Sequence, residues 1–251
     1  MARKYKKLIG MASLALVTVL TVGIFAIRAK AFDVIYEEKD PAFKVANYAG
    51  NPLSQNYKPK GEVLYDGELA YKENVSTYSV RTNSFVWWET EDNLTFAYNK
   101  YKLSYGDQSR ITVQGTFERQ VVETEGKDLH TNASVGVAIR GDDDKSANGV
   151  YLHMRDSVIM VVYRDKAGNV CKPTEQYNIT QYPVQMKLEK AGNLFTPSFK
   201  CGTDKWVQMK PIAVVMGEDV YAGVAAHSTD QETTIRCDFT DYSVIVEGPD
   251  G

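Results

Sequence analysis

Cysteine and histidine are scarce in this chain of 251 residues, which has three of each. Three cysteines exclude a disulfide-dense scaffold and a four-cysteine zinc site. Neither the H-E-x-x-H motif of zinc proteases nor the G-x-S-x-G motif of α/β-hydrolases occurs. The formal net charge is −3, so the basic surface that nucleic-acid binding requires is also missing. These absences exclude several kinds of hydrolase and predict no nucleic-acid partner.

Acidic residues are absent from the first 32 positions. Four basic residues between positions 3 and 7 precede an uncharged run of 20 residues, Leu8 to Ile27. A basic start and an apolar run are typical of an export signal, and the run is long enough to cross a bilayer as a helix. Ala29-Lys30-Ala31 provides an A-x-A cleavage site. Two alternatives stay open: cleavage after Ala31, or retention of residues 1–31 as an N-terminal membrane anchor.

Both alternatives predict that residue 32 and everything after it lie outside the cytoplasm. The first 31 residues contain six of the 29 basic residues and none of the 32 acidic ones, so the remainder has a formal net charge of −9. Such an acidic domain is not drawn to anionic surfaces by its net charge. We therefore expect membrane contact only through the N-terminal segment. The oligomeric state does not follow from the sequence.

An odd number of cysteines in an exported chain leaves at least one thiol unpaired. Cys237 alternates with Ile235 and Phe239, so we expect it to be a small core residue. Cys171 and Cys201 remain as the pair for a disulfide bridge.

Turn-forming residues divide the chain into an arm and a domain. Residues 32–60 contain Pro41, Pro52 and Pro59 and no sustained apolar period, which predicts a linker or N-terminal arm. Residues 61–248 contain short apolar-alternating segments separated by Gly, Asn and Asp. The predicted strands are 110–118, 134–140, 149–155, 158–164, 184–190, 193–200, 219–228 and 233–248. Many short strands with regular turns predict an all-β antiparallel sandwich or barrel.

The two faces of these strands differ in character. Val135, Val137 and Ile139 alternate with small residues and Arg140 in the segment 134–140, and strands 149–155 and 219–228 follow the same scheme. The aliphatic face suits the sandwich core. The second face combines small residues with Tyr, His or Arg, which leaves two interpretations: a shallow concave ligand groove or a plain solvated outer face.

The ordered segments SFVWWETEDNLTFAY, RITVQGTFE, ASVGVAIR, GVYLHMR, YPVQMKLEKAGNLFTPSFKCGTDKW and VVMGEDVYAGVAAHS resemble a known family. Over about residues 62–247 the chain is similar to the bacterial concanavalin A-like lectin/glucanase domains of unknown function, labelled as similar to regulators of enolase and related to laminin G-like sandwiches. The matching landmarks are Trp88, Thr90, Asp92, Arg140 and Trp206. The resemblance implies a jelly-roll sandwich of two antiparallel sheets and an oligo- or polysaccharide ligand.

Glucanases of this superfamily place acidic residues in an E-x-D-x-x-E strand motif. The nearest cluster here is Glu89-Thr90-Glu91-Asp92, and no third acid follows in phase. We therefore expect a carbohydrate-binding domain without catalytic residues. A glycosidase or lyase is the first alternative, and a surface adhesion or scaffold domain with a protein partner is the second.

The acidic stretch Asp142-Asp143-Asp144, with Ser146 and Asn148, offers hard oxygen ligands for calcium. Its spacing does not match a 12-residue calcium loop, because the Gly at position 6 and the closing Glu are missing. A solvated charged turn is the favoured interpretation, so we expect no cofactor and keep calcium as a weak alternative.

The predicted ligand-binding residues are Trp88, Asp92, Arg140, Tyr151, His153, Tyr221 and His227. Trp88 and the two tyrosines would stack on sugar rings, and the polar members would bind hydroxyl groups. A buried ion pair between Arg140 and Asp92 is the rival interpretation of that pair. We expect Trp206 to be a packing residue and His130 to lie in a loop.

Overall fold

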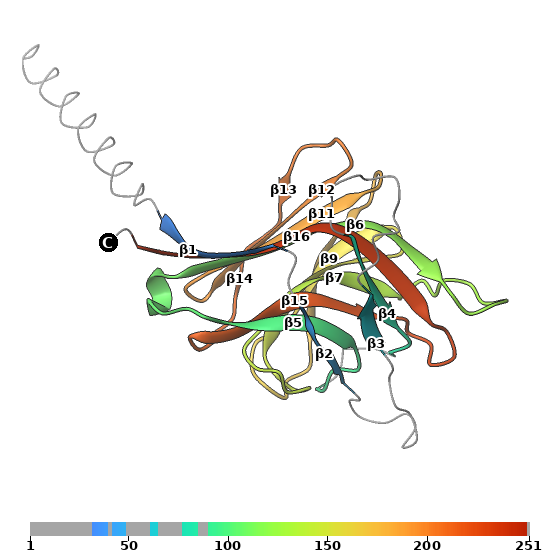
Figure 1. Ribbon diagram of the computed structural model, residues 1–251, viewed down its shortest axis with the longest axis horizontal. Coiled ribbons are helices and arrows are strands. Elements are labelled where there is room, and N and C mark those ends of the chain that lie inside the picture. The colour runs from blue at the N-terminus through green and yellow to red at the C-terminus, as the bar shows by residue number, and fades with distance from the viewer. Residues whose placement is uncertain (1–31, 40–41, 49–60, 65–76, 85–89, 250–251) are drawn as a thin grey trace, which may run out of the picture.

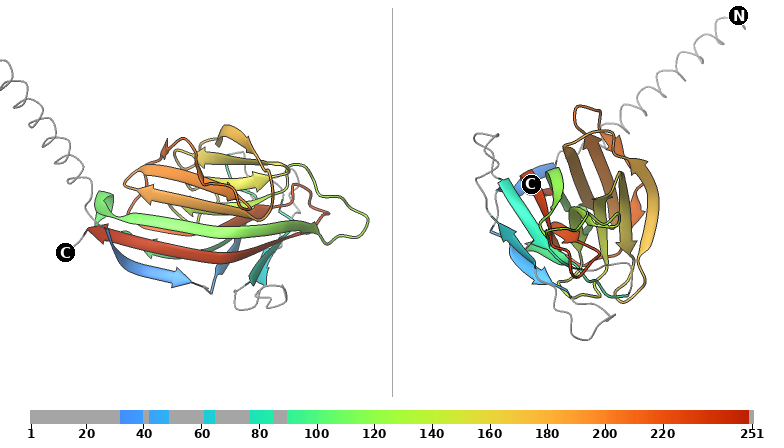
Figure 2. Two further views of the ribbon diagram at one scale, coloured as in Figure 1. Left: turned by 90° about the horizontal axis from the view of Figure 1, so that it is seen from above. Right: turned by 90° about the vertical axis from the view of Figure 1, so that its right-hand side faces the viewer.

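The computed structural model describes residues 32–39, 42–48, 61–64, 77–84 and 90–249. Over these residues the chain forms two antiparallel sheets that pack face to face (Figures 1 and 2). The described residues include one short 3-10 turn, η1 (Gly106–Gln108), and no helix with the length and hydrophobicity of a membrane span. The predicted signal or anchor in residues 1–31 and the predicted stacking residue Trp88 lie outside the described residues.

The first sheet, called sheet A, contains the two longest strands, β6 and β16, in its centre. Its order is β13 (Val207–Gln208), β12 (Leu194–Cys201), β11 (Val184–Ala191), β6 (Arg110–Val122), β16 (Ile235–Pro249), β4 (Thr77–Thr82) and β3 (Gly61–Leu64), with β14 (Ile212–Ala213) beside β12 and β1 (Phe32–Lys39) beside β16.

The second sheet, called sheet B, contains a meander of adjacent strands from β7 to β10. Its order is β10 (Lys172–Asn178), β9 (Val158–Arg164), β8 (Gly149–Arg155), β7 (Ser134–Arg140), β15 (Asp219–His227), β5 (Thr95–Lys102) and β2 (Lys44–Asn47). The predicted all-β, two-sheet sandwich is therefore confirmed. Strands β7, β8 and β9 begin and end where their alternation predicts.

The segment 32–60 differs from its prediction as a linker or arm. Its residues 32–39 form β1 beside β16, and residues 44–47 form β2 at the edge of sheet B. These two strands were not predicted because prolines and glycines interrupt the segment, β1 carries no polar alternation and β2 is only four residues long. The first described strand thus belongs to sheet A and the second to sheet B.

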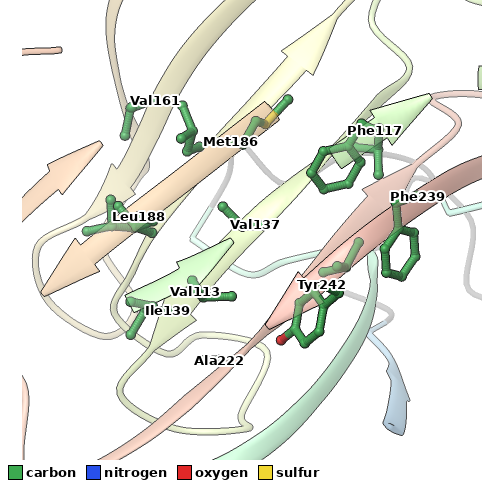
Figure 3. Close-up of a cluster of buried hydrophobic side chains, with 14 of the residues drawn as sticks. Val113, Phe117, Val137, Ile139, Val161, Met186, Leu188, Ala222, Phe239 and Tyr242 are labelled. Carbon is green, nitrogen blue, oxygen red and sulfur yellow. The ribbon is translucent and has the colours of Figure 1, made fainter. Parts of the chain in front are cut away.

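The main core lies between the inner faces of the two sheets (Figure 3). Val113, Leu188 and Phe117 of sheet A point toward Val137 and Ile139 of sheet B. All five are fully buried, and the alternation along β7 predicts this for Val137 and Ile139. Close packing of such side chains is the dominant favourable contribution to the stability of the sandwich.

The three cysteines are buried free thiols. Cys237 lies in the main core, as predicted. The alternative of a Cys171–Cys201 bridge is wrong, since Cys201 belongs to the core between the sheets and Cys171 to a separate cluster on the other face of sheet B.

That other face of sheet B is buried as well. A second apolar cluster covers it, built from Tyr48, Leu94, Phe96, Tyr98, Ala138, Tyr151, Met160, Val162, Cys171 and Ala225. The small residues at the centre of the face allow flat rings to lie on it. Tyr151 of β8 reaches across β7, where its hydroxyl donates a hydrogen bond to the carbonyl oxygen of Ala225 on β15.

Gly136 is one of these small central residues, and its replacement by alanine is expected to destabilise the fold. A Cβ atom there would overlap the Leu152 carbonyl oxygen and crowd the His153 backbone. Because backbone atoms cannot rotate away, we expect Gly136→Ala to cost about 1–3 kcal/mol in chemical unfolding. Gly115→Ala in β6 is the matched control, since its Cβ would meet its nearest neighbour at 3.6 Å. Equal unfolding curves for both variants would contradict this account.

Candidate functional site

One row of residues runs across the second face of sheet B and defines the candidate site. Strand pairing places Arg164, Gly149, Arg140, Tyr221 and Lys100 directly beside one another on β9, β8, β7, β15 and β5. Three cations therefore lie in one row. Gly149 has no side chain between the two arginines, so their guanidinium groups can approach the same acceptor.

That acceptor is Asp92. Arg140 Nη1 donates to Asp92 Oδ2, and Arg164 Nη2 donates to Asp92 Oδ1 at 2.6 Å. All three side chains are buried. Burial by itself lowers the pKa of Arg140, but the charge of Asp92, its hydrogen bond and the neighbouring Tyr48 together outweigh burial, and the pKa lies above its ordinary value. The ion pair that was the rival interpretation of Arg140 and Asp92 is thus formed, and Arg164 extends it to a triad.

The backbone holds this triad from several sides. Asp92 lies in the turn before β5, where its N–H donates to the Lys145 carbonyl at 2.8 Å. Arg140 Nη2 donates to the Asp144 carbonyl at 2.6 Å. Arg164 donates to the carbonyls of Ala147 and Asn169, both at 2.8 Å. The triad therefore joins the ends of β7 and β9 to three loops, which gives it a role in positioning those loops.

A small cavity adjoins the triad. Asp92, Arg140, Arg164, Tyr151 and Cys171 are among the residues that line it, and its volume is about 10 Å³. This space corresponds to about one water molecule. A monosaccharide ring does not fit there, so any sugar on this row has to bind farther toward Lys100.

At one end of the face the predicted residues are buried. The rings of Tyr151 and His153 stack at 4.9 Å, and His227 Nδ1 lies 3.1 Å from the Thr229 hydroxyl oxygen. Burial lowers the pKa of His227 to about 3, with the charges of Arg155 and His130 acting in the same direction. Both histidines are therefore neutral groups inside the protein.

At the other end the face opens to solvent around Tyr221. The ring centres of Tyr98 and the half-buried Tyr221 lie 5.7 Å apart in an edge-to-face arrangement, and Lys100 Nζ lies 5.6 Å from the centre of the Tyr221 ring. Tyr98 donates its hydroxyl to Asp143 Oδ2 at 3.1 Å, and Lys100 pairs with Asp219 at 2.8 Å. This set, called the Tyr221 end, combines an accessible ring with charged hydrogen-bonding groups.

The acidic loop takes part in these contacts through its side chains. Asp144 Oδ1 accepts hydrogen bonds from the Ser146 N–H and hydroxyl, and these hydrogen bonds lower the pKa of Asp144. Asp142 accepts from the N–H of Asp143. All three aspartates are exposed, as expected for a solvated turn. Within the described residues, no three His, Cys, Asp or Glu side chains are grouped to hold a metal ion.

Trp206 was expected to pack inside the fold, and this prediction is wrong. Its side chain is 45% exposed at the edge of sheet A, next to the short strand β13. Lys187 Nζ lies 5.1 Å from the ring centre. A two-residue edge strand offers no neighbour to cover such a large ring.

The structure brings six of the seven predicted ligand residues to one face of sheet B. Five of these are buried: Asp92, Arg140, Tyr151, His153 and His227. Tyr221 is half-buried and belongs to the accessible end. His130 is exposed in the β6–β7 loop, as predicted.

Sequence reasoning missed Arg164, Lys100 and Tyr48, whose ring lies 4.9 Å from the Arg140 guanidinium. A signal for Arg164 was present. In an antiparallel meander, alternate strands end at the same edge, and the segments 134–140 and 158–164 both end in arginine.

The fold defines this chain as an antiparallel two-sheet sandwich, and comparison with known proteins agrees. No family model and no curated protein matches the sequence. A solved protein of unknown function from Saccharomyces cerevisiae is similar at a TM-score of 0.52 and 10% identity, over 76% of this chain and 97% of that one. A protein of unknown function from Shewanella oneidensis MR-1 has a TM-score of 0.51 and 8% identity, with 82% and 86% of the two chains covered.

A third solved structure, the lectin from Bauhinia forficata in complex with GalNAc, is more distant. Its TM-score is 0.44 at 9% identity, over 83% of this chain and 100% of that one. The two structures with a TM-score above 0.5 support the sandwich fold. Identities of 8–10% carry no activity from one chain to the other. The narrower likeness to laminin G-like and enolase-regulation domains stays a prediction.

Proposed function

We propose that this chain is an exported, non-catalytic domain that binds oligo- or polysaccharide at the Tyr221 end of sheet B. The observation that carries the proposal is the accessible Tyr221 ring, flanked by Lys100 and by the carboxylate that accepts from Tyr98. A pyranose presents C–H groups on its face and hydroxyls on its rim. An aromatic ring bordered by charged donors and acceptors suits both.

Export, in this proposal, follows from the first 31 residues. The basic start, the uncharged run from Leu8 to Ile27 and the A-x-A site support it. Cleavage would release the domain, and retention would tether it to the membrane. In both cases a polysaccharide outside the cytoplasm is within reach of the Tyr221 end.

The non-catalytic part of the proposal rests on how the nearby carboxylates are engaged. Asp219 pairs with Lys100, and Asp143 accepts the hydroxyl of Tyr98. Hydrolysis of a glycosidic bond uses one carboxylic acid as proton donor and one free carboxylate as nucleophile or base. The ion pair favours the charged form of Asp219 and so disfavours it as the proton donor.

The test is a binding screen of residues 32–251 on a glycan and polysaccharide panel, with and without calcium. We expect a calcium-independent ligand whose affinity falls about tenfold in Tyr221→Ala, because ring stacking is lost. Tyr163→Ala is the matched control: this half-buried tyrosine also has a lysine, Lys172, at 6.0 Å from its ring, but belongs to β9. Thermal unfolding checks that both variants are folded.

Three outcomes would overturn parts of the proposal. No binding by the folded wild type across the panel would favour the adhesion or scaffold alternative. Loss of binding on chelation would move the site to the Asp142–Asp144 turn. Shortening of a bound oligosaccharide that stops in Asp143→Asn or Asp219→Asn would make the protein a glycosidase or lyase. Trp88→Ala belongs in the same panel, because its predicted stacking role remains a prediction.

A further inference from the structure

Three large apolar or aromatic side chains are exposed together where the described chain begins. Ile35 and Tyr36 of β1 are 50% and 46% exposed, and Tyr105 is 53% exposed. Tyr36 pairs with the core residue Val246, whereas Val34 pairs with Glu247 and lies on the opposite face of the sheet. Ile35 and Tyr105 meet above Gly248, where a Cβ atom would lie 2.5 Å from Ile35 Cδ1 and 2.9 Å from Tyr105 Cδ2. Ile35, Tyr36 and Tyr105 form one surface, called the β1 patch.

A β-bulge shapes this patch. The pairing of β1 with β16 shifts register between Val34 and Tyr36, so Ile35 has no partner in the ladder. Bulges commonly redirect a side chain. Here the bulge leaves the consecutive residues Ile35 and Tyr36 exposed on the same side of the strand, although a solvated edge strand normally carries polar or charged side chains. Exposed apolar groups gathered in this way mark an interaction surface.

The position of the patch along the chain indicates the partner. The uncharged run ends at Ile27, and β1 begins at Phe32, five residues later. Five residues reach at most about 18 Å even when extended. If the run remains as a membrane anchor, β1 is therefore held close to the bilayer surface. Tyrosine with aliphatic neighbours is the composition that favours the interface between water and lipid.

We infer that the β1 patch lies against the extracytoplasmic leaflet of the membrane, with Ile35 among the upper acyl chains and the two tyrosines at headgroup level. This inference rests on the anchored alternative of the proposed function. It adds a lipid contact made by the sandwich itself. Asp33 and Glu37 are the exposed charges next to the patch on β1, so zwitterionic lipid is preferred over anionic lipid.

Fluorescence quenching in vesicles tests the contact. The full chain carrying Ile35→Cys, labelled with a bimane fluorophore, is reconstituted into phosphatidylcholine vesicles that contain a nitroxide-labelled lipid. Labelling is selective because the native cysteines are buried. Leu129→Cys is the control, an exposed site in the β6–β7 loop at the other end of the molecule (Figure 2). The strand β16 pairs with β1 at its Pro249 end and with the last residue of β6 at Ile235, and its 15 residues span roughly 45 Å between these ends.

We expect severalfold stronger quenching at position 35 than at position 129, and weaker quenching at 35 when phosphatidylserine is added. Equal quenching at both positions in chains that float with the vesicles would overturn the lipid contact. A chain that does not float with the vesicles would overturn it too, by removing the anchor. Neither result bears on glycan binding by residues 32–251, so failure here is distinguishable from failure of the proposed function.

Discussion

Replacing Asp92 with asparagine is expected to lower the free energy of unfolding by about 3–5 kcal/mol. The substitution keeps the size of the side chain and removes its charge, which leaves Arg140 and Arg164 as two buried cations with no counterion between them. Removing one partner of a buried ion pair costs far more than the pair itself contributes, because the remaining charge stays desolvated. Urea unfolding monitored by tryptophan fluorescence measures the change.

The matched control is Asp219→Asn. That carboxylate also pairs with a cation, Lys100, at 2.8 Å, but both side chains are about half exposed. An exposed pair contributes less than about 1 kcal/mol, so the control should unfold almost like the wild type. Similar losses in both variants would show that the triad is not the buried cluster described here. Joint replacement of Asp92, Arg140 and Arg164 by apolar residues of similar volume should recover most of the stability.

Acid is expected to destabilise the protein through His227. The folded-state pKa of about 3 lies below the ordinary value of 6.5 because the imidazole is buried. Between these two values the unfolded chain binds one more proton than the folded chain. Above about pH 6.5 His227 is neutral in both states and does not lower the free energy of unfolding. As the pH drops from 6.5 toward 3, the free energy of unfolding falls by about 1.4 kcal/mol per pH unit. Burial also lowers the pKa of His153 well below its ordinary value, so the two effects add.

The comparison is between wild type and His227→Gln, each unfolded with urea at several pH values between 7 and 4. The variant loses the titrating group, so its stability should fall less steeply with decreasing pH. The difference in slope should approach one proton near pH 5. Parallel curves for the two proteins would contradict a buried, neutral His227. Calorimetric proton uptake on unfolding at pH 5 provides an independent measurement.

Local alternation was sufficient to predict eight of the 16 strands in the described part of the chain. Val135, Val137 and Ile139 had to share a face because side chains alternate along a strand. The structure places all three in the main core. The strands that were not predicted include the edge strands β2, which has four residues, and β10 (KPTEQYN), which is mostly polar, so neither carries an apolar period. Their strand structure depends on hydrogen bonds to a neighbour that the sequence pattern does not reveal.

The groove predicted on sheet B is filled by the protein's own side chains. Gly136, Ala138, Gly223 and Ala225 were identified correctly as a small-residue centre, and this centre was interpreted as room for a ligand or as a solvated face. In the structure, the ring of Tyr151 and the rest of the second apolar cluster occupy this space. The sequence contains no local signal that distinguishes space for a ligand from space for the protein's own side chain.

The sequence by itself determined the fold class, the core face of β7, β8 and β15 and the residue types that gather on sheet B. These properties follow from the two-residue period of a strand, which is local. Only the tertiary structure decided that Arg164 joins Arg140 on Asp92, that both histidines are buried, and that Tyr221 alone of the six described ligand candidates is appreciably accessible. Burial and ion pairing depend on which strands become neighbours and which loops cover them. The contact between Asp92 and Arg164, for example, joins residues 72 positions apart.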